Sequence, residues 1–333
     1  MNSRRKLLAL TFAGLAGSFG FAGIQGAQAQ APLQDITYLL PAPGSLPAFG
    51  PWMVAKQRGY FTAEGLNVNF QVARGGVDVA KQVGAGNAVV GGAIGDTPII
   101  VRSNGVPVKA IAVIGGRALM QLAVNKDKGI NSVKDLKGKT ITVLAYQDTT
   151  FFALLGMLAT QGMTKNDVNA QAVGPVNIWK LFAAGQSDAM AGTPEWTIQA
   201  RKESPKMNIE AIPSDTVFKS MAQAIVASDE TIQKNPELLR KIVRATLKGM
   251  KALMDDPAAA AVDYAKAVPE FTGKEADLTE IFKSYNTLVY PGQKVLGEMD
   301  ESRLSALQDF YLKEGIIEKT TPVKELYTNQ FLQ

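Results

Sequence analysis

The chain has 333 residues, with 35 lysine and arginine residues against 30 aspartate and glutamate residues, and with no histidine or cysteine. Without those two residue types it cannot build a Ser-His-Asp triad, a cysteine nucleophile, a disulfide, or a zinc site of thiolate or imidazole ligands. Carboxylates alone can bind a hard cation, but no acidic cluster has the spacing of a calcium loop. We therefore expect no metal, no other cofactor and no catalytic residue.

The first thirty residues have the pattern of an export signal. Residues 4–6 are basic, residues 7–22 are apolar, and residues 27–29 (Ala-Gln-Ala) form a small-x-small sequence that a signal peptidase can cleave. The sequence therefore predicts a signal peptide over residues 1–29, removed before Gln30. The two arginines also resemble the twin-arginine motif, so the general secretory route and the twin-arginine route both stay open.

The part that follows the signal has nearly balanced charge. Removing residues 1–29, which hold three of the basic residues, leaves 304 residues with 32 basic and 30 acidic side chains. This balance does not favour nucleic acid or an acidic membrane surface as a partner. The apolar run is too short to span a membrane, and a chain without cysteine has no thiol for a lipid anchor. We expect an unanchored monomer in the periplasm of a Gram-negative bacterium.

Short β-branched segments alternate with helical patterns over most of the chain, which is typical of parallel sheets joined by crossover helices. The first series predicts strands at residues 36–40, 68–72, 88–92 and 108–114 and helices at 49–57, 77–83 and 97–103. A second series predicts strands at 120–125, 140–144, 170–173, 188–191 and 222–227 and helices at 132–136, 149–161 and 176–184. The last hundred residues predict helices at 236–254, 257–267, 274–288 and 301–314.

These elements predict two α/β lobes with a helical tail that packs back on the first. We expect the chain to cross between the lobes near residues 119–125 and again near residues 222–228. Lobe 1 would then comprise residues 30–121 and 226–333, and lobe 2 residues 122–225. A cleft outside the carboxyl ends of the strands would bind a small ligand.

Several segments resemble one family of proteins. Residues 59–68 (GYFTAEGLNV) are similar to the GYF-x-x-EGL-x-V sequence of the sulfonate-, nitrate- and taurine-type solute-binding proteins of ABC importers, which are related to the thiamine-pyrimidine synthase proteins. Tyr60 and Phe61 are interpreted as core residues and Gly65 as a turn. The resemblance implies the two-lobed type II periplasmic-binding-protein fold. It continues in order at residues 84–88, 94–98, 133–143 and 181–189.

The resemblance also implies a function without chemistry. Such a protein closes its lobes over a small organic molecule (a sulfonate, an aromatic acid or a pyrimidine-like compound) and delivers it to an ABC permease and its ATPase. An exported sensor that presents its cargo to a membrane receptor is an alternative. An enzyme of the thiamine-pyrimidine synthase type fits less well, because those proteins use a histidine of their own as a substrate donor and this chain has none.

Loops at the strand ends supply the candidate ligand-binding residues. Ser45 lies in a Pro/Gly loop where the backbone can approach a ligand, and Phe49 is either a pocket wall or a core residue. Asp96 and Thr97 begin a helix, where backbone and hydroxyl donors suit an anion or a carbonyl group. The same two residues can instead simply cap that helix.

The loop over residues 145–150 departs from the family pattern, since the anion binders of the family usually have a Gly/Ser-rich turn here. Tyr146 and Asp148 occupy it, followed by Thr149 and Thr150. An inward Asp148 would repel a sulfonate or nitrate and favour a ligand with N–H donors. An Asp148 that only caps the helix would satisfy the amides that an anion needs. Either way, we expect weak binding of nitrate and sulfate.

Two further candidates are open to more than one interpretation. Glu195 and Trp196 follow Thr193-Pro194, where the family often has a Trp-Glu-Pro arrangement, and the altered order leaves both ligand contact and simple packing possible. Arg117, after two glycines near the first crossing, would either pair with a carboxylate or sulfonate or remain a solvated hinge residue.

Overall fold

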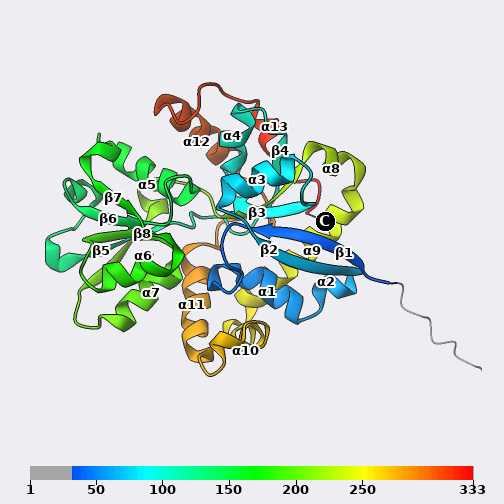
Figure 1. The fold of residues 1–333 in the computed structure, drawn as a ribbon, viewed down its shortest axis with the longest axis horizontal. Helices are drawn as coiled ribbons and strands as arrows, with labels where there is room; N and C mark the ends of the chain where they lie inside the picture. The colour runs from blue at the N-terminus through cyan, green and yellow to red at the C-terminus, as the bar shows by residue number, and fades with distance from the viewer. Residues whose placement is uncertain (1–31, 333) are drawn as a thin grey trace, which may run out of the picture. The chain divides into compact units, whose positions relative to one another are not determined.

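The computed structural model describes residues 32–332 (Figure 1). The predicted signal peptide and its cleavage position lie outside the described residues. The segment Leu33–Gln333 forms one compact unit that carries every described helix and strand. No helix within residues 32–332 combines the length and the apolar character needed to cross a bilayer.

The first sheet has the strand order β2-β1-β3-β10-β4. β1 pairs in parallel with β2 and β3, whereas β10 runs antiparallel to both β3 and β4. The strand expected at 88–92 lies two residues later, at β3, because Gly91 and Gly92 are inside the strand and do not end it. Gly91 packs closely against the helix Gly76–Gly84, since a Cβ on Gly91 would lie 2.2 Å from Val79 Cγ1. The strands are β1 (Gln34–Leu40), β2 (Leu66–Val72), β3 (Val90–Ile94), β4 (Val108–Val113) and β10 (Gln223–Ser228).

The second sheet has the order β7-β6-β8-β5-β9. β6 pairs in parallel with β7 and β8, while β5 runs antiparallel to β8 and β9. β9 was not expected from the sequence, since it is an edge strand with a single buried residue that ends at a proline. The strands are β5 (Gln121–Asn125), β6 (Thr140–Val143), β7 (Asn169–Ala172), β8 (Ala189–Gly192) and β9 (Ile209–Pro213).

Both sheets are mixed, so the prediction of parallel sheets is wrong in one respect. β5 and β10 are the strands that enter a sheet directly after the chain has crossed from the other sheet. Each of these strands runs antiparallel to both of its neighbours in the sheet that it enters.

Side-chain alternation separates the two faces of each sheet. In the second sheet, Leu122 and Val124 pack with α5, whereas Ala123 and Met190 pack with α6 and α7 on the other face (Figure 1). In the first sheet, Tyr38 belongs to the large core that includes α1, α9, α10 and α11, and its neighbour in sequence, Leu39, packs with α3. This period of two is what a strand buried on both faces requires.

The predicted helices lie close to their predicted positions, and those predicted at 97–103 and 257–267 have the predicted bounds. The segment predicted as a helix at 132–136 is a 3-10 turn, and the helices at 60–63, 194–203, 229–234 and 323–326 were not predicted. The helices are α1 (Gly50–Gln57), α2 (Tyr60–Ala63), α3 (Gly76–Gly84), α4 (Thr97–Ser103), α5 (Thr149–Ala159), α6 (Gly174–Ala183), α7 (Pro194–Glu203), α8 (Asp229–Lys234), α9 (Pro236–Asp255), α10 (Pro257–Ala267), α11 (Glu275–Leu288), α12 (Glu301–Lys313) and α13 (Val323–Leu326). Short 3-10 turns are η1 (Pro47–Phe49), η2 (Lys126–Lys128), η3 (Val133–Leu136), η4 (Lys165–Asp167), η5 (Ser214–Thr216) and η6 (Pro269–Phe271).

The family-like segment at residues 59–68 is structural, as interpreted from the sequence. Phe61 is buried in the large core, and Gly65 has a φ of 77°, a left-handed conformation that favours glycine. Glu64 accepts two hydrogen bonds from the Arg244 guanidinium, at 2.7 and 2.5 Å, and so ties this segment to α9.

The chain passes between the sheets twice, through residues 114–120 and 214–222, and one arginine of α12 holds both passages. The Arg303 guanidinium donates to the carbonyl oxygens of Gly116 (2.9 Å) and Ser220 (3.2 Å) and to the Asp215 carboxylate (2.7 Å). Asp215 also accepts from the Ala118 amide at 3.0 Å. The lobe boundary expected between residues 225 and 226 falls inside β10. The division into two lobes stays a prediction.

Candidate functional site

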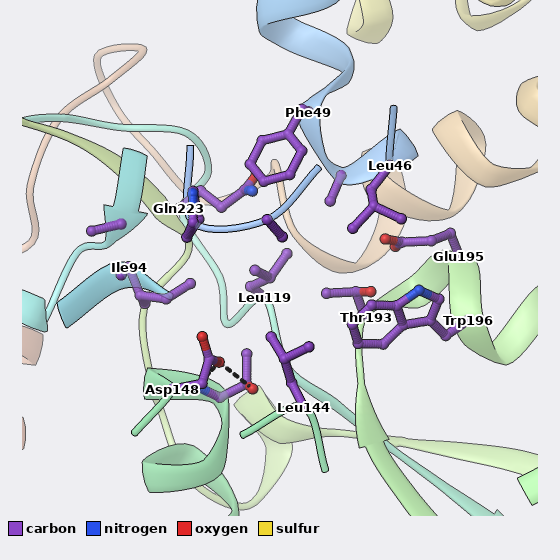
Figure 2. A pocket seen from close by; sticks show the side chains of 16 residues that line it. Leu46, Phe49, Ile94, Leu119, Leu144, Asp148, Thr193, Glu195, Trp196 and Gln223 are labelled. Atoms are coloured by element: carbon purple, nitrogen blue, oxygen red, sulfur yellow. Dashed lines mark hydrogen bonds between the residues drawn. The ribbon is translucent and has the colours of Figure 1, made fainter. Parts of the chain in front are cut away.

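A small cavity lies where strand ends from both sheets converge (Figure 2). Its wall is formed by segments that follow the carboxyl ends of β1, β2, β6 and β8, by the last two residues of β3, by Leu119 of the first passage and by the first residue of the antiparallel β10. This is the edge at which open α/β sheets bind ligands. The lining residues are Pro41, Ala42, Leu46, Ala48, Phe49, Gly76, Ala93, Ile94, Leu119, Leu144, Asp148, Thr150, Thr193, Glu195, Trp196 and Gln223.

The cavity has a volume of about 50 Å³. One water molecule needs roughly 10–15 Å³ on this scale, so the space admits a few waters and excludes a heterocyclic ring. A ring-sized ligand therefore enters only when the walls separate.

Glu195 is the most buried ionisable group of this wall. Thr193 and Pro194 begin α7, and proline at the first helical position fixes the turn that carries Glu195. Its Oε2 atom accepts a hydrogen bond of 2.7 Å from the Tyr285 hydroxyl of α11. Its Oε1 atom has no hydrogen-bond partner among the described residues. In Figure 2 the carboxylate points toward Leu46.

Burial raises the pKa of Glu195, against the smaller opposing effect of the hydrogen bond from the Tyr285 hydroxyl. The hydroxyl of Thr193 is also buried and has no hydrogen-bond partner within residues 32–332. An unpaired buried polar atom costs about 1–3 kcal/mol, so a ligand that donates hydrogen bonds to these oxygens would recover that energy.

Asp148 combines the two roles that the sequence left open. Its Oδ1 atom caps α5 by accepting from the Thr150 amide (2.9 Å) and the Thr150 hydroxyl (2.5 Å), drawn as dashed lines in Figure 2. The side chain also lines the cavity, and burial raises its pKa. Thr149 begins α5. Because the Thr150 amide is already satisfied, the cap leaves that donor unavailable to an anion.

Two of the lining residues are large aromatic groups. Phe49, in η1, is 3% exposed and packs edge-on against Trp52, so it serves as core residue and wall at once. Trp196 is 4% exposed and packs against Gly192, where a Cβ would lie 2.6 Å from the indole ring. The altered order of the Thr-Pro-Glu-Trp segment therefore still brings both Glu195 and Trp196 to the cavity.

Gln223 was missed by the sequence analysis. It is the first residue of β10 and its amide, which both donates and accepts hydrogen bonds, lines the cavity. The sequence did not indicate this role, because a polar residue near the start of a predicted strand is usually exposed to solvent. Only the antiparallel entry of β10 brings this end of the strand to the cavity.

Asp96 and Thr97 lie outside the lining of this cavity. Asp96 is fully buried and accepts a hydrogen bond of 2.5 Å from the Tyr311 hydroxyl of α12. Burial raises its pKa to about 6, and the neighbouring charge of Asp148 adds to this. The Thr97 hydroxyl accepts from the Ile94 amide at 3.2 Å. Asp96 Oδ2 and the Thr97 hydroxyl bind the protein itself, whereas Asp96 Oδ1 has no hydrogen-bond partner among the described residues. Ligand contact by these two residues stays a prediction.

Ser45, Arg117 and Tyr146 also lie outside it. The Ser45 carbonyl accepts from the Tyr264 hydroxyl at 2.9 Å, which turns this loop toward α10. The Arg117 guanidinium donates to the carbonyl of Thr287 in α11 at 2.9 Å. Tyr146 is 53% exposed, and its hydroxyl donates to the Ala170 carbonyl. Each of these three residues forms a hydrogen bond with a residue far away in the sequence, which the spacing of residues in the chain does not reveal.

The described part of the chain contains no group of three or more acidic, histidine or cysteine side chains arranged to hold a metal ion.

Two mixed sheets whose strand ends meet at a cavity define a protein of the periplasmic-binding-protein fold. The alkanesulfonate-binding protein SsuA from Xanthomonas axonopodis pv. citri, solved bound to MOPS, superposes with a TM-score of 0.68 over 90% of this chain and 99% of its own, at 16% identity. The chain belongs to the NMT1/THI5 like family, whose model matches residues 46–260.

Two curated relatives extend over most of the sequence. The riboflavin-binding protein RibY of Chloroflexus aurantiacus is 25% identical over 311 residues, which cover 91% of this chain and 88% of the relative. The 4-amino-5-hydroxymethyl-2-methylpyrimidine phosphate synthase of Aspergillus parasiticus is 24% identical over 237 residues, 67% of this chain and 68% of the relative. By name, one relative is a binding protein and the other an enzyme.

Proposed function

We propose that this protein is the solute-binding component of an ABC importer. It is exported to the periplasm as a monomer, closes over a small organic molecule and delivers that molecule to a permease and its ATPase. The fold, the cavity formed by both sheets and the similarity to a named riboflavin-binding protein support this function. The small volume of the cavity supports an opening and closing cycle, in which ligand shifts the population toward the closed state.

The part of the ligand that we propose to occupy the cavity is a flat, neutral or cationic heterocycle that carries N–H donors. The observation that carries this proposal is the buried Oε1 atom of Glu195, which has no partner in a largely apolar wall. Asp148 adds a second carboxylate, and no basic side chain lines the cavity. An oxyanion would be desolvated next to like charge without a compensating cation, which is costly.

Titration calorimetry with four ligands tests this proposal: riboflavin, 4-amino-5-hydroxymethyl-2-methylpyrimidine, sulfate and nitrate. We expect at least one heterocycle to bind and the two inorganic anions to bind weakly or not at all. Glu195→Gln should weaken the heterocycle about tenfold or more, as the loss of a charged acceptor of 1.5–3 kcal/mol implies. Glu237→Gln, at an exposed position of α9, is the matched control. Tight nitrate or sulfate binding with no heterocycle bound contradicts the proposal.

A synthase activity is the second candidate, since several fungal relatives carry that name. The absence of histidine from the sequence argues against it, because the synthase type that this chain resembles is expected to consume one of its own histidines. Mass spectrometry of ligand and protein after a long incubation separates the two candidates. Binding alone leaves both masses unchanged, and a modified ligand or a protein of altered mass favours the enzyme.

A further inference from the structure

A second hollow continues outward from the cavity. This outer groove has a volume of about 530 Å³ and shares Pro41, Ala42, Leu144 and Asp148 with the cavity, so the two spaces are contiguous at these residues. The outer groove is therefore the part of the site that a ligand longer than one ring would occupy. Its remaining lining residues are Pro43, Val72, Ala73, Arg74, Gly75, Ala145, Tyr146, Gln147, Ala172, Gly174 and Pro175.

The groove offers a fixed apolar wall. Val72 is 59% exposed and Tyr146 is 53% exposed, and both line the groove. The Tyr146 ring is held in place, because its hydroxyl donates to the Ala170 carbonyl at 2.9 Å and its edge packs against Phe151 with ring centroids 5.4 Å apart. A rigid exposed ring beside prolines is a surface on which an apolar or planar part of a ligand packs without ordering the protein further.

Among the residues that the structure describes, Arg74 is the only basic one that lines either space. It is exposed, and only its backbone amide is engaged, donating to Asp78 at 2.9 Å. Within residues 32–332, every other arginine side chain donates a hydrogen bond to a protein oxygen, whereas the Arg74 guanidinium donates none. The one arginine without a protein acceptor is thus the one at the mouth of the candidate site.

The charged residues are divided between the two connected spaces. Glu195 lines only the cavity, Asp148 lines both spaces where they join, and Arg74 lines only the outer groove. Gly75, next to Arg74 in the chain, lies beside Asp148, since a Cβ there would lie 3.9 Å from Asp148 Oδ2. A ligand complementary to this order presents N–H donors inward and an anionic group outward. A planar guanidinium binds a phosphate or carboxylate through two parallel hydrogen bonds.

We infer that the ligand of this protein is a heterocycle that bears an anionic substituent, of the phosphate, sulfonate or carboxylate class, and that Arg74 binds this substituent at the mouth of the cleft. The inference rests on the proposed function and deepens it by dividing the ligand into an inner hydrogen-bond donor and an outer anion. Arg74 is then a specificity-determining residue, which selects the charged ester over the uncharged alcohol.

Two matched ligand pairs test the inference by calorimetry: 4-amino-5-hydroxymethyl-2-methylpyrimidine with its phosphate ester, and riboflavin with riboflavin 5′-phosphate. In at least one pair, we expect the phosphate to bind the wild type about tenfold more tightly than the alcohol, the scale of one charge-assisted contact at an exposed position. Arg74→Gln should abolish this preference and change the affinity for the alcohol by less than about twofold. Arg74→Lys should keep part of it. The control Arg240→Gln, on the outer face of α9, should behave as wild type.

The outcomes separate the inference from the proposed function. The inference is overturned if an alcohol binds and its phosphate binds no better, or if Arg74→Gln keeps the preference. If neither member of either pair binds, the proposed heterocycle class itself fails, and the inference falls with it. A preference that decreases between about 20 and 300 mM NaCl supports an exposed ionic contact, because salt screens such pairs. A salt-independent preference contradicts the role of Arg74.

Discussion

At the scale of single residues, two buried carboxylates, Asp148 and Glu195, line the cavity, and a third, Asp96, is buried outside its lining. Burial raises the pKa of each. Each is partly satisfied by a hydroxyl donor, namely Tyr311, Thr150 or Tyr285. Burying three acids is costly for stability, because the charged form of each is desolvated. The proposed ligand, with its donor groups, would offset part of this cost at Asp148 and Glu195.

The raised pKa of Asp96 predicts a pH-dependent stability. Its pKa is about 6 in the folded protein against an ordinary value of 3.8, so the folded state binds this proton more tightly than the unfolded chain. Stability is therefore highest at low pH and falls as pH rises through the window from about 4 to 6. At pH 7.5 the cost is on the order of 3 kcal/mol, at 1.36 kcal/mol per pKa unit. Asp148 and Glu195 act in the same direction.

Thermal unfolding of the ligand-free protein at pH 5.0 and pH 7.5 measures this effect. We expect a higher Tm at pH 5.0, and we expect Asp96→Asn to raise the Tm at pH 7.5 and to reduce the difference. Asp135→Asn is the control: the pKa of Asp135 is lowered by backbone donors, so its contribution is lost only below its ordinary value of 3.8. A wild type that is equally stable at both pH values, or more stable at pH 7.5, contradicts the prediction.

The helices α1 and α9 show how closely two elements of this fold approach. α9 has buried residues at helical spacing along one face, among them Leu239, Ile242, Met250 and Leu253. At Gly249 the helix backbones nearly touch, since a Cβ there would lie 2.0 Å from the carbonyl oxygen of Pro51. This close packing holds α1, and with it the Phe49 wall of the cavity, on the first sheet.

Gly249→Ala is therefore expected to destabilise the protein, even though alanine favours a helix by about 1 kcal/mol over glycine. The backbone of α1 has to move, and overpacking of this kind costs typically 1–3 kcal/mol, occasionally more. Gly156→Ala on α5 is the comparison: its Cβ would meet the Phe218 ring at 2.3 Å, and that partly buried side chain is able to shift. Urea unfolding of both variants measures the difference. A Gly249→Ala protein as stable as wild type contradicts the packing argument.

At the scale of the whole molecule, Arg303 joins the two passages between the sheets. Its side chain is 9% exposed and contacts residues of both passages and of η5. Gly115 and Gly116 allow α11 and the following loop to approach the first passage, because a Cβ on either would lie within 2.6 Å of a carbonyl oxygen. We expect any opening of the cleft to pivot about this cluster, because Arg303 contacts both passages.

Arg303→Met should loosen these passages. It removes the ion pair to Asp215 and leaves that half-buried carboxylate with only the Ala118 amide, at an expected cost of about 2–3 kcal/mol in the free energy of unfolding. We also expect small-angle scattering of the ligand-free variant to show a larger radius of gyration. Arg240→Met, at an exposed pair on α9, is the control. Unchanged stability together with an unchanged radius would show that Arg303 does not restrain the hinge.

By itself, the sequence determined the α/β class, most strands and helices, and the family. Helices and strands of this kind are set by the pattern of residues within a short stretch of sequence. For this reason the helix over residues 97–103 was predicted with its observed bounds. The sequence also identified five residues that line the cavity, because residues that follow parallel strands gather at one edge of a sheet. These are Phe49, Asp148, Thr150, Glu195 and Trp196.

Only the tertiary structure decided which of these side chains share a cavity. β5 and β10 run antiparallel, which brings Gln223 to the wall, and neither a strand's direction nor its neighbours are encoded locally. Asp96 is removed from the lining by Tyr311, which lies 215 residues away in the chain. Asp148 could not be assigned from its spacing, because capping a helix and facing a cavity are compatible roles for one carboxylate with two oxygens.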